Sequence, residues 1–347
     1  MSEPSKHRFI EALYQRPHDG VPVWFMRQAG RYLPGYMSVR SKTDFLTLCR
    51  TPDLAAEVTL EPVDKFGVDA AIIFSDILVP LEGMGLKVEF TDRGPCMSAP
   101  LDGAADIDRL VISDPIDDTG FVMDVIRAVK ERAAGRVPVI GFAGAPFTLA
   151  CYALEGSPSK TFARAMSLAY GDPPLFHKLL DKLSETIIAY LKAQVEAGAE
   201  AIQLFDSWGG MLAHDTFGEY SLAYCRRIME ALDGCGVPRI LFIKGAGLRL
   251  DEIADIGVEA ISFDDSLHPA EAQRIVGDRA ALQGNLSPHA LLGTPDGLRE
   301  RVRGILDVLG SRPGYVFNLG HGILPPTPVE NVRAVVDEVH AYPGGGR

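Results

Sequence analysis

The chain has 347 residues, of which 47% are hydrophobic, and a net charge of −12 at pH 7. This apolar fraction supports a large buried core and excludes an intrinsically disordered chain. The acidic excess argues against a surface that binds nucleic acid or an anionic membrane, so any anionic ligand must be met by locally concentrated arginine.

The five cysteines occur without a close pair such as C-x-x-C. Isolated thiols in odd number are typical of a reducing compartment and give no zinc-binding spacing. The stretch MSEPSKHRFIEAL lacks the apolar core of a signal peptide, and no run approaches the ~18 apolar residues of a membrane span. We therefore expect a cytoplasmic protein without a membrane segment.

A short apolar run, a loop and a longer amphipathic segment recur along the chain. The apolar runs are expected to be parallel strands, because they are mostly apolar rather than alternating. These runs span residues 21–25, 70–74, 138–142, 201–205, 240–243, 260–263, 281–284 and 316–319. Helices are expected in the amphipathic segments 53–67, 178–198 and 296–310.

Three expected helix starts share a Thr-Pro pair, which puts threonine at the N-cap and proline at the first helical position. The pairs are Thr51-Pro52, Thr294-Pro295 and Thr327-Pro328. At the last of them, Glu330 would complete a T-x-x-E capping box.

Strands alternating with helices predict a single (β/α)8 TIM barrel over residues 1–347, rather than a doubly wound sheet. A doubly wound sheet usually has a glycine-rich dinucleotide turn after its first strand, whereas RQAGR follows here. The connection 75–137 is expected to carry an insertion after the second strand, with a hairpin at 85–98. Residues 1 to about 15 and 341–347 are expected to be peripheral or flexible.

Chemistry in a TIM barrel lies at the C-terminal ends of the strands. The polar residues that follow the expected strands are Arg27, Gln28, Arg31, Ser75, Asp76, Tyr152, Asp206, Ser207, Lys244, Asp264, Asp265, Asn285 and His321. This set offers cations, carboxylates, hydroxyls and a histidine, but no H-E-x-x-H and no cluster of three metal-type ligands. It predicts a metal-free site that holds a carboxylate-bearing organic molecule and acts by acid–base electrostatics.

Structural roles stay open for several of these residues. A strand-end arginine is often a surface ion-pair partner, although two arginines that frame a glycine favour bidentate carboxylate binding. Asp76 is equally suited to cap a helix, and Asp206 to anchor its own loop. Tyr152 is open to core packing and Lys244 to Schiff-base chemistry, whereas function is favoured over packing for His321, which stands between two glycines.

Six blocks, in order along nearly the whole chain, are similar to those of the uroporphyrinogen decarboxylase family. They are PVWFMRQAGRYLPGY (22–36), IIFSDILVPLEGMG (72–85), GFAGAPFTLACYALEG (141–156), QLFDSWGG (203–210), LQGNL (282–286) and FNLGHGILPPTP (317–328). The RQAGRY block is highly specific, and LQGNL alone would be weak. Two departures concern loops only: the family often has aspartate in place of Ser287 and tryptophan in place of Asp265.

The resemblance implies a cofactor-free decarboxylase acting on uroporphyrinogen III. Such an enzyme removes the carboxyl groups of four acetate side chains and gives coproporphyrinogen III, in haem and chlorophyll biosynthesis. The family is a single (β/α)8 barrel, usually homodimeric. This would explain the two arginines of the RQAGRY block, because the substrate carries eight carboxylates and arginine suits carboxylate binding.

By the same resemblance, a substrate-binding loop is formed by Arg27, Gln28, Ala29, Gly30 and Arg31. Asp76 would lie beneath the macrocycle, accept hydrogen bonds from the pyrrole N–H groups and stabilise the developing positive charge. Tyr152, Ser207 and His321 would contact substrate carboxylates or shape the cleft. Arg27 is the proton donor that the family suggests, with His321 or a bound water left open.

Three rival interpretations carry distinct requirements. A methyltransferase of related fold would need zinc held by histidine and cysteines, for which no H-x-C block exists. A tetrapyrrole carrier that has lost turnover stays open, although the presence of both arginines and Asp76 speaks against it. A phosphate-binding sugar enzyme would use GHGILPPTP and leave RQAGRY without a role.

Overall fold

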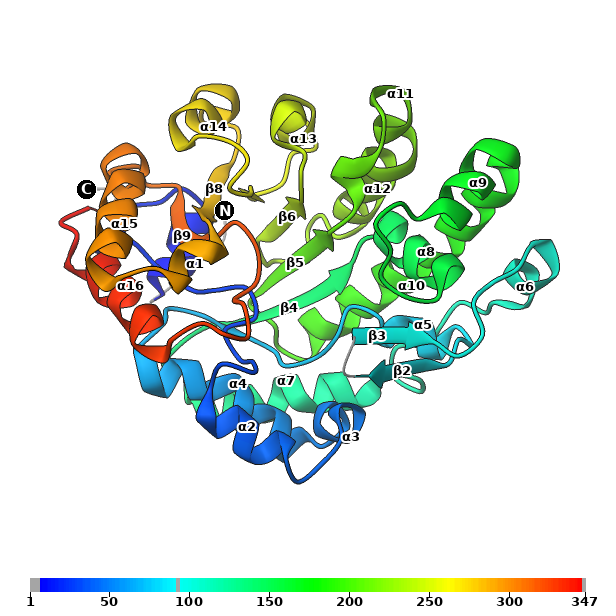
Figure 1. Cartoon of the computed structure of the whole chain (residues 1–347), viewed down its shortest axis with the longest axis horizontal. Helices are drawn as coiled ribbons and strands as arrows, with labels where there is room; N and C mark the ends of the chain where they lie inside the picture. The colour runs from blue at the N-terminus through cyan, green and yellow to red at the C-terminus, as the bar shows by residue number, and fades with distance from the viewer. Residues whose placement is uncertain (1–6, 92–93, 345–347) are drawn as a thin grey trace.

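The computed structural model describes residues 7–91 and 94–344, and its main element is a curved parallel sheet (Figure 1). Its seven strands run in the order β1-β4-β5-β6-β7-β8-β9. Their bounds are Ala71–Ile72, Val139–Gly144, Ala201–Asp206, Arg239–Ile243, Ala260–Ser262, Ala281–Leu286 and Tyr315–Leu319. Seven of the eight expected strands are thus confirmed, and the fold is α/β.

Helices surround this sheet, and their layer returns on itself (Figure 1). The helices after the first strand of the sheet are α5 (Val79–Gly83), α6 (Ala104–Arg109), α7 (Gly120–Ala133), α8 (Pro146–Glu155), α9 (Ala163–Gly171), α10 (Pro173–Glu196), α11 (His214–Phe217), α12 (Ala223–Ala231), α13 (Leu250–Ala254), α14 (Pro269–Val276), α15 (Pro295–Leu309) and α16 (Val329–Ala341). Before that strand come α1 (Arg8–Leu13), α2 (Pro34–Arg40), α3 (Phe45–Arg50) and α4 (Pro52–Phe66). Because α16 packs against both α15 and α4, the last helix meets the first long one. The expected helices at 53–67, 178–198 and 296–310 correspond to α4, α10 and α15.

The expected first strand, residues 21–25, is not a strand but an extended segment between the two edges of the sheet. On one side, Val23 makes a single parallel bridge to Phe317 of β9, and Trp24 N donates to Phe317 O over 3.3 Å. On the other side, Asp69 N donates to Val23 O, and the Asp69 carboxylate accepts from Val23 N, each over 2.8 Å. The strand prediction fails here because a carboxylate replaces one of the ladder partners.

The insertion within residues 75–137 contains the expected hairpin. Strands β2 (Val88–Thr91) and β3 (Gly94–Met97) pair antiparallel, as predicted for residues 85–98. Within the described residues, α5, α6 and α7 make up the rest of this connection.

Two of the three Thr-Pro helix starts are confirmed, since Thr51 and Thr294 occupy the N-cap positions of α4 and α15. The third is wrong. Helix α16 begins one residue later than expected, with Pro328 at its N-cap, and the buried Thr327 hydroxyl has no partner within the described chain. The capping box with Glu330 therefore does not form.

Part of the expected peripheral N-terminus lies in the core. Residues 1–6 and 345–347 are outside the described residues, but α1 buries Phe9 and Leu13 completely. The Phe9 ring meets Trp24 edge-on, with 6.5 Å between the ring centroids. This helix therefore packs beneath the segment 21–25 rather than at the periphery.

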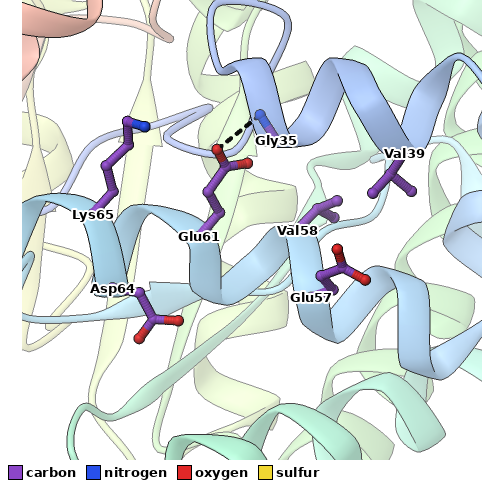
Figure 2. A pocket seen from close by; sticks show the side chains of 7 residues that line it. All are labelled: Gly35, Val39, Glu57, Val58, Glu61, Asp64 and Lys65. Carbon is purple, nitrogen blue, oxygen red and sulfur yellow. Dashed lines mark hydrogen bonds between the residues drawn. The ribbon is translucent and has the colours of Figure 1, made fainter.

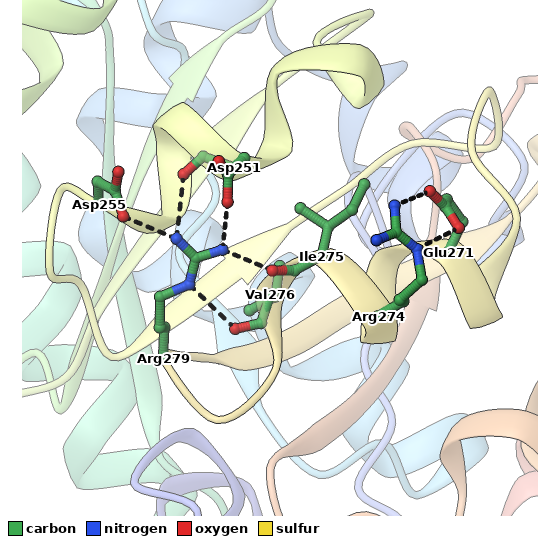
Figure 3. A network of polar contacts seen from close by, with 7 residues as sticks. All are labelled: Asp251, Asp255, Glu271, Arg274, Ile275, Val276 and Arg279. Carbon is green, nitrogen blue, oxygen red and sulfur yellow. Dashed lines mark hydrogen bonds and ion pairs between the residues drawn. The ribbon is translucent and has the colours of Figure 1, made fainter.

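Surface ion pairs join neighbouring helices of the outer layer. Figure 3 shows Arg279, which follows α14, donating to Asp251 of α13 over 2.6 Å and to Asp255 over 2.7 Å. The same guanidinium donates to the carbonyl oxygen of Ile275 over 2.5 Å. Because these groups are exposed, we expect each pair to contribute at most about 1 kcal/mol.

A buried glutamine of α10 replaces a missing strand partner beside β1. Ile73 N donates to Ile140 O, so alternate residues of β4 face β1, but β1 ends at Ile72. Beyond that point the fully buried Gln194 side chain accepts from Phe142 N over 2.8 Å and donates to Phe142 O over 2.9 Å.

We predict that Gln194→Leu lowers the free energy of unfolding by about 2–4 kcal/mol, because it leaves two buried backbone groups of Phe142 without partners. Urea denaturation followed by circular dichroism measures this loss. The matched control is Gln273→Leu on the exposed face of α14, which should change stability by less than about 0.5 kcal/mol. Equal stability of the two variants would contradict the role given to Gln194.

Candidate active site

Buried contacts fix the loop that carries Arg27 and Arg31. Gln28 is fully buried, and its side chain accepts from Phe25 N over 3.1 Å and donates to Ala70 O over 2.9 Å. The Tyr32 hydroxyl donates to Gln28 O over 2.8 Å. The side chain of Gln28, expected at the ligand, therefore points beneath the loop and ties it to the residue before β1.

The far end of this loop is held by a carboxylate on α4. Glu61 accepts from Gly35 N over 3.1 Å (Figure 2). It also accepts from Tyr36 N over 2.7 Å, so that both N–H groups near the start of α2 have a partner. The surface hollow in Figure 2 is lined by Gly35, Val39, Glu57, Val58, Glu61, Asp64 and Lys65. Because three carboxylates line it, this hollow does not suit an anionic ligand.

Arg27 is held by its backbone and by the loop after β9. Its φ of +59° is a conformation that residues with a side chain seldom adopt, and such strain is concentrated at functional sites. Its side chain lies across Gly322, where an added Cβ would stand 2.6 Å from the Arg27 Cγ. Gly322 therefore makes room for Arg27 beside His321. This close approach explains why a glycine follows His321 in the G-H-G motif.

Both arginines of the loop are exposed and without a protein partner. Arg239, by contrast, pairs with Glu259 over 2.9 Å, whereas neither Arg27 nor Arg31 makes a hydrogen bond or ion pair to any residue that the structure describes. The backbone N–H groups of Ala29, Gly30 and Arg31 likewise find no acceptor within the described ranges. The ion-pair alternative is thus not realised within the described residues, and the loop presents two guanidinium groups and three backbone N–H donors.

Asp76 faces these donors from the end of β1. Its side chain is half-buried, and Oδ1 accepts from Leu78 N over 2.9 Å. Burial raises the pKa of Asp76 to about 6, against the opposing effects of the Leu78 N–H and the positive charge of Arg27. The carboxylate stabilises its own turn, and its second oxygen remains available to a ligand.

Tyr152 and His321 lie in the electrostatic field of the same groups. Burial raises the pKa of Tyr152, and the negative charge of Asp76 adds to this rise. Burial lowers the pKa of His321 to about 3, and the positive charges of Arg27 and Lys244 lower it further. His321 is therefore neutral at pH 7 and can donate or accept a hydrogen bond but cannot act as an imidazolium acid.

Two other strand-end carboxylates are structural. Asp206 is fully buried and accepts from the hydroxyl groups of Thr148 and Ser221, each over 2.5 Å. Asp264 accepts from Ser266 N over 3.0 Å and from Gly245 N. The loop-anchoring alternative is thus realised for Asp206, and sequence alone had no means to separate it from Asp76.

Ser207 follows β5 directly and is half-buried, without a hydrogen bond to any described residue. The structure thus brings Arg27, Asp76, Tyr152 and His321 into one electrostatic cluster, and leaves Gln28 beneath it.

Among the described residues, no group of three or more His, Cys, Asp or Glu side chains is placed to hold a metal ion. In the same part of the chain, none of the helices combines the length and apolar character needed to cross a bilayer.

The fold and this cluster define a class of protein, an α/β protein with two exposed arginines and a half-buried carboxylate near the carboxyl ends of parallel strands. The family model described as "Uroporphyrinogen decarboxylase (URO-D)" matches residues 4–342. The chain belongs to the uroporphyrinogen decarboxylase family, and is therefore a carboxy-lyase.

Named relatives resemble the chain over nearly their full length. The uroporphyrinogen decarboxylase of Syntrophotalea carbinolica is 50% identical, with 97% of this chain and 98% of that protein covered. That of Actinobacillus succinogenes is 46% identical, with 99% and 98% covered. Among solved structures, a methyltransferase from Methanosarcina mazei has a TM-score of 0.79 at 24% identity, with 96% of this chain and 97% of that chain covered. This last likeness concerns the fold alone.

We predict that Arg27→Gln raises the pKa of Asp76 above about 6, because Arg27 stabilises the ionised carboxylate. Titration of the ¹³Cγ resonance of Asp76 measures this shift. Arg31→Gln is the matched control and should leave the titration unchanged, since Arg31 is not among the charges that shift the pKa of Asp76. An equal response to both substitutions would place the source of the effect elsewhere.

Proposed function

We propose that this enzyme removes the four acetate carboxyl groups of uroporphyrinogen III as carbon dioxide and gives coproporphyrinogen III, in haem and chlorophyll biosynthesis. The observation that carries the proposal is Arg27, a cation that has no partner among the described residues and is held across Gly322 near the half-buried Asp76. Two relatives that are 46% and 50% identical to the chain are named uroporphyrinogen decarboxylase, which supports the same substrate.

Substrate binding follows from charge. In an acidic chain, Arg27, Arg31 and the free N–H groups of the loop, including those of Ala29 and Gly30, supply donors for several of the eight carboxylates. Gln28 contributes by holding the loop rather than by touching the ligand.

The chemistry requires that positive charge develop on a pyrrole ring. Protonation of the ring α-carbon next to an acetate gives an iminium, which accepts the electron pair of the breaking C–C bond as carbon dioxide leaves. The exocyclic carbon then takes a proton and becomes a methyl group, and the ring α-carbon loses the proton that it gained in the first step, which restores the pyrrole. Each cycle therefore consumes one proton overall. Asp76, beneath the macrocycle, stabilises this cation and accepts hydrogen bonds from the pyrrole N–H groups without any cofactor.

Protein groups around Asp76 have separate roles in this scheme. Arg27 is the proposed donor of the ring proton, since a neutral His321 with a pKa of about 3 is a poor source of one. His321, Tyr152 and Ser207 contact substrate carboxylates through hydrogen bonds. A bound water in place of Arg27 is the remaining donor for the ring proton.

The architecture that we propose for this activity is a single (β/α)8 barrel domain closed by residues 21–25. The bridge from Val23 to Phe317 and the packing of α16 on α4 support closure. We further propose a cytoplasmic homodimer that binds no nucleic acid and no membrane. The free thiols of all five cysteines and the net charge of −12 support these assignments.

We predict that the purified protein converts uroporphyrinogen III anaerobically to the four-carboxyl product, with or without EDTA. Asp76→Asn should lower kcat by about 10³-fold, because an amide cannot stabilise the iminium. Chromatography of the oxidised products, counted by carboxyl number, measures both results. Asp117→Asn, an exposed carboxylate in the insertion, is the control and should retain full rate. Binding without any loss of carboxyl groups would favour the carrier interpretation.

We predict an acid limb in kcat/KM with a midpoint near pH 6, since protonation removes the charge of Asp76. Activity should therefore rise as pH increases through 6. The same limb should persist in His321→Gln at lower rate, because the pKa of His321 is about 3. Loss of the limb in His321→Gln would assign the titration to the histidine instead.

A further inference from the structure

Lys244 follows β6 directly and is the one strand-end cation that the proposed reaction leaves without a role. Its backbone is fixed on both sides, because Lys244 N donates to Asp206 O over 3.0 Å and Gly210 N donates to Lys244 O over 3.2 Å. A Cβ at Gly210 would collide with the Lys244 carbonyl oxygen, so the two loops meet backbone to backbone. The side chain of Lys244 therefore starts from a rigid point.

The sheet register determines the face on which Lys244 lies. Gln283 of β8 donates to Gln203 of β5 over 3.0 Å, and these strands are not neighbours, so both side chains must point into the interior. Alternation along β5 then places Phe205 and Ser207 on the same inner face. Because Phe205 pairs in register with Phe242 of β6, Lys244 stands at the level of Ser207 on this face.

Aromatic contacts support this placement. The ring of Phe242 lies 6.0 Å from that of Phe205 and 6.2 Å from that of His321, measured between centroids. Lys244 is thus one step above an aromatic layer and next to His321, whose pKa its charge lowers. The positive charge of Arg27, whose side chain lies across the adjacent Gly322, acts on His321 as well.

Lys244 as a whole residue is half-buried, and none of the described residues accepts a hydrogen bond from its ammonium group or forms an ion pair with it. Lys182 shows the alternative, since its ammonium donates to the carbonyl oxygens of Ile107, Asp108 and Leu110. A partly buried cation without a partner is unfavourable unless a bound ligand supplies the opposite charge and accepts its hydrogen bonds. The carboxylates Asp206 and Asp264, which lie at the ends of the neighbouring strands β5 and β7, are already occupied by loop donors.

We infer that Lys244 binds a carboxylate of the substrate beside His321. The neutral imidazole then lies near two cations and donates or accepts a hydrogen bond without repelling them. The identity of the substrate rests on the proposed function. The need for an anion at Lys244 rests instead on the position of this residue and on its lack of a partner among the described residues. This role belongs to binding, so it should act on KM rather than on kcat.

Lys244→Met, which keeps the length of the side chain and removes its charge, tests the inference. The probes are uroporphyrin III, the oxidised octacarboxylate, for binding by fluorescence quenching, and uroporphyrinogen III for turnover. We expect Kd and KM to rise about tenfold to hundredfold, with kcat changed less than about threefold, and a shallower dependence of Kd on salt. Lys244→Arg should restore most of the affinity.

The control is Lys192→Met, which removes one exposed charge from α10 and should leave Kd and KM unchanged. An unchanged Kd in Lys244→Met, or equal effects of both substitutions, would overturn the inference while turnover by the unaltered enzyme keeps the proposed function. If the unaltered enzyme binds uroporphyrin III but releases no carbon dioxide, the proposed function fails. Weaker binding by Lys244→Met would then still support the carboxylate site.

Discussion

The proximity of the unpaired guanidinium of Arg27 to the half-buried carboxylate of Asp76 is the constraint on which the rest of the site depends. Burial holds the pKa of Asp76 near 6, and Arg27 is the charge that keeps it from rising further. The same guanidinium lowers the pKa of His321 and depends on Gly322 for its room. Moving Arg27 would therefore alter three elements of the site at once.

Buried or capped polar groups support the loop that carries this exposed cation. Gln28 fixes the loop from beneath, Glu61 holds its far end through α2, and Asp206 anchors the loop after β5. These buried or capped polar groups satisfy backbone and hydroxyl donors that would otherwise be costly. Arg27 and Arg31 are thus left without partners among the residues that the structure describes, because neighbouring polar residues carry the structural contacts.

The sequence predicted the elements better than the roles of single polar residues. Apolar runs located seven strands because buried parallel strands have few polar positions, and RQAGRY located the arginines. The segment 21–25 was misjudged because its ladder partner is the carboxylate of Asp69, which no local pattern reveals. The sequence does not show that the Gln28 side chain is buried, because its partner, the Ala70 carbonyl oxygen, is distant along the chain. Asp206 and Asp76 are equivalent in the sequence, and only the hydrogen bonds from Thr148 and Ser221 show that Asp206 is structural.

The stability of Asp76→Asn as a function of pH tests the central claim most directly. A folded-state pKa raised from 3.8 to about 6 means that the folded protein binds this proton more tightly, so stability is lost as pH rises through that window. At pH 7.5 the neutral amide should therefore be more stable than the wild-type carboxylate by about 1–3 kcal/mol, and the gain should vanish near pH 4. A variant of equal or lower stability at pH 7.5 would contradict the account of a strained carboxylate maintained for catalysis.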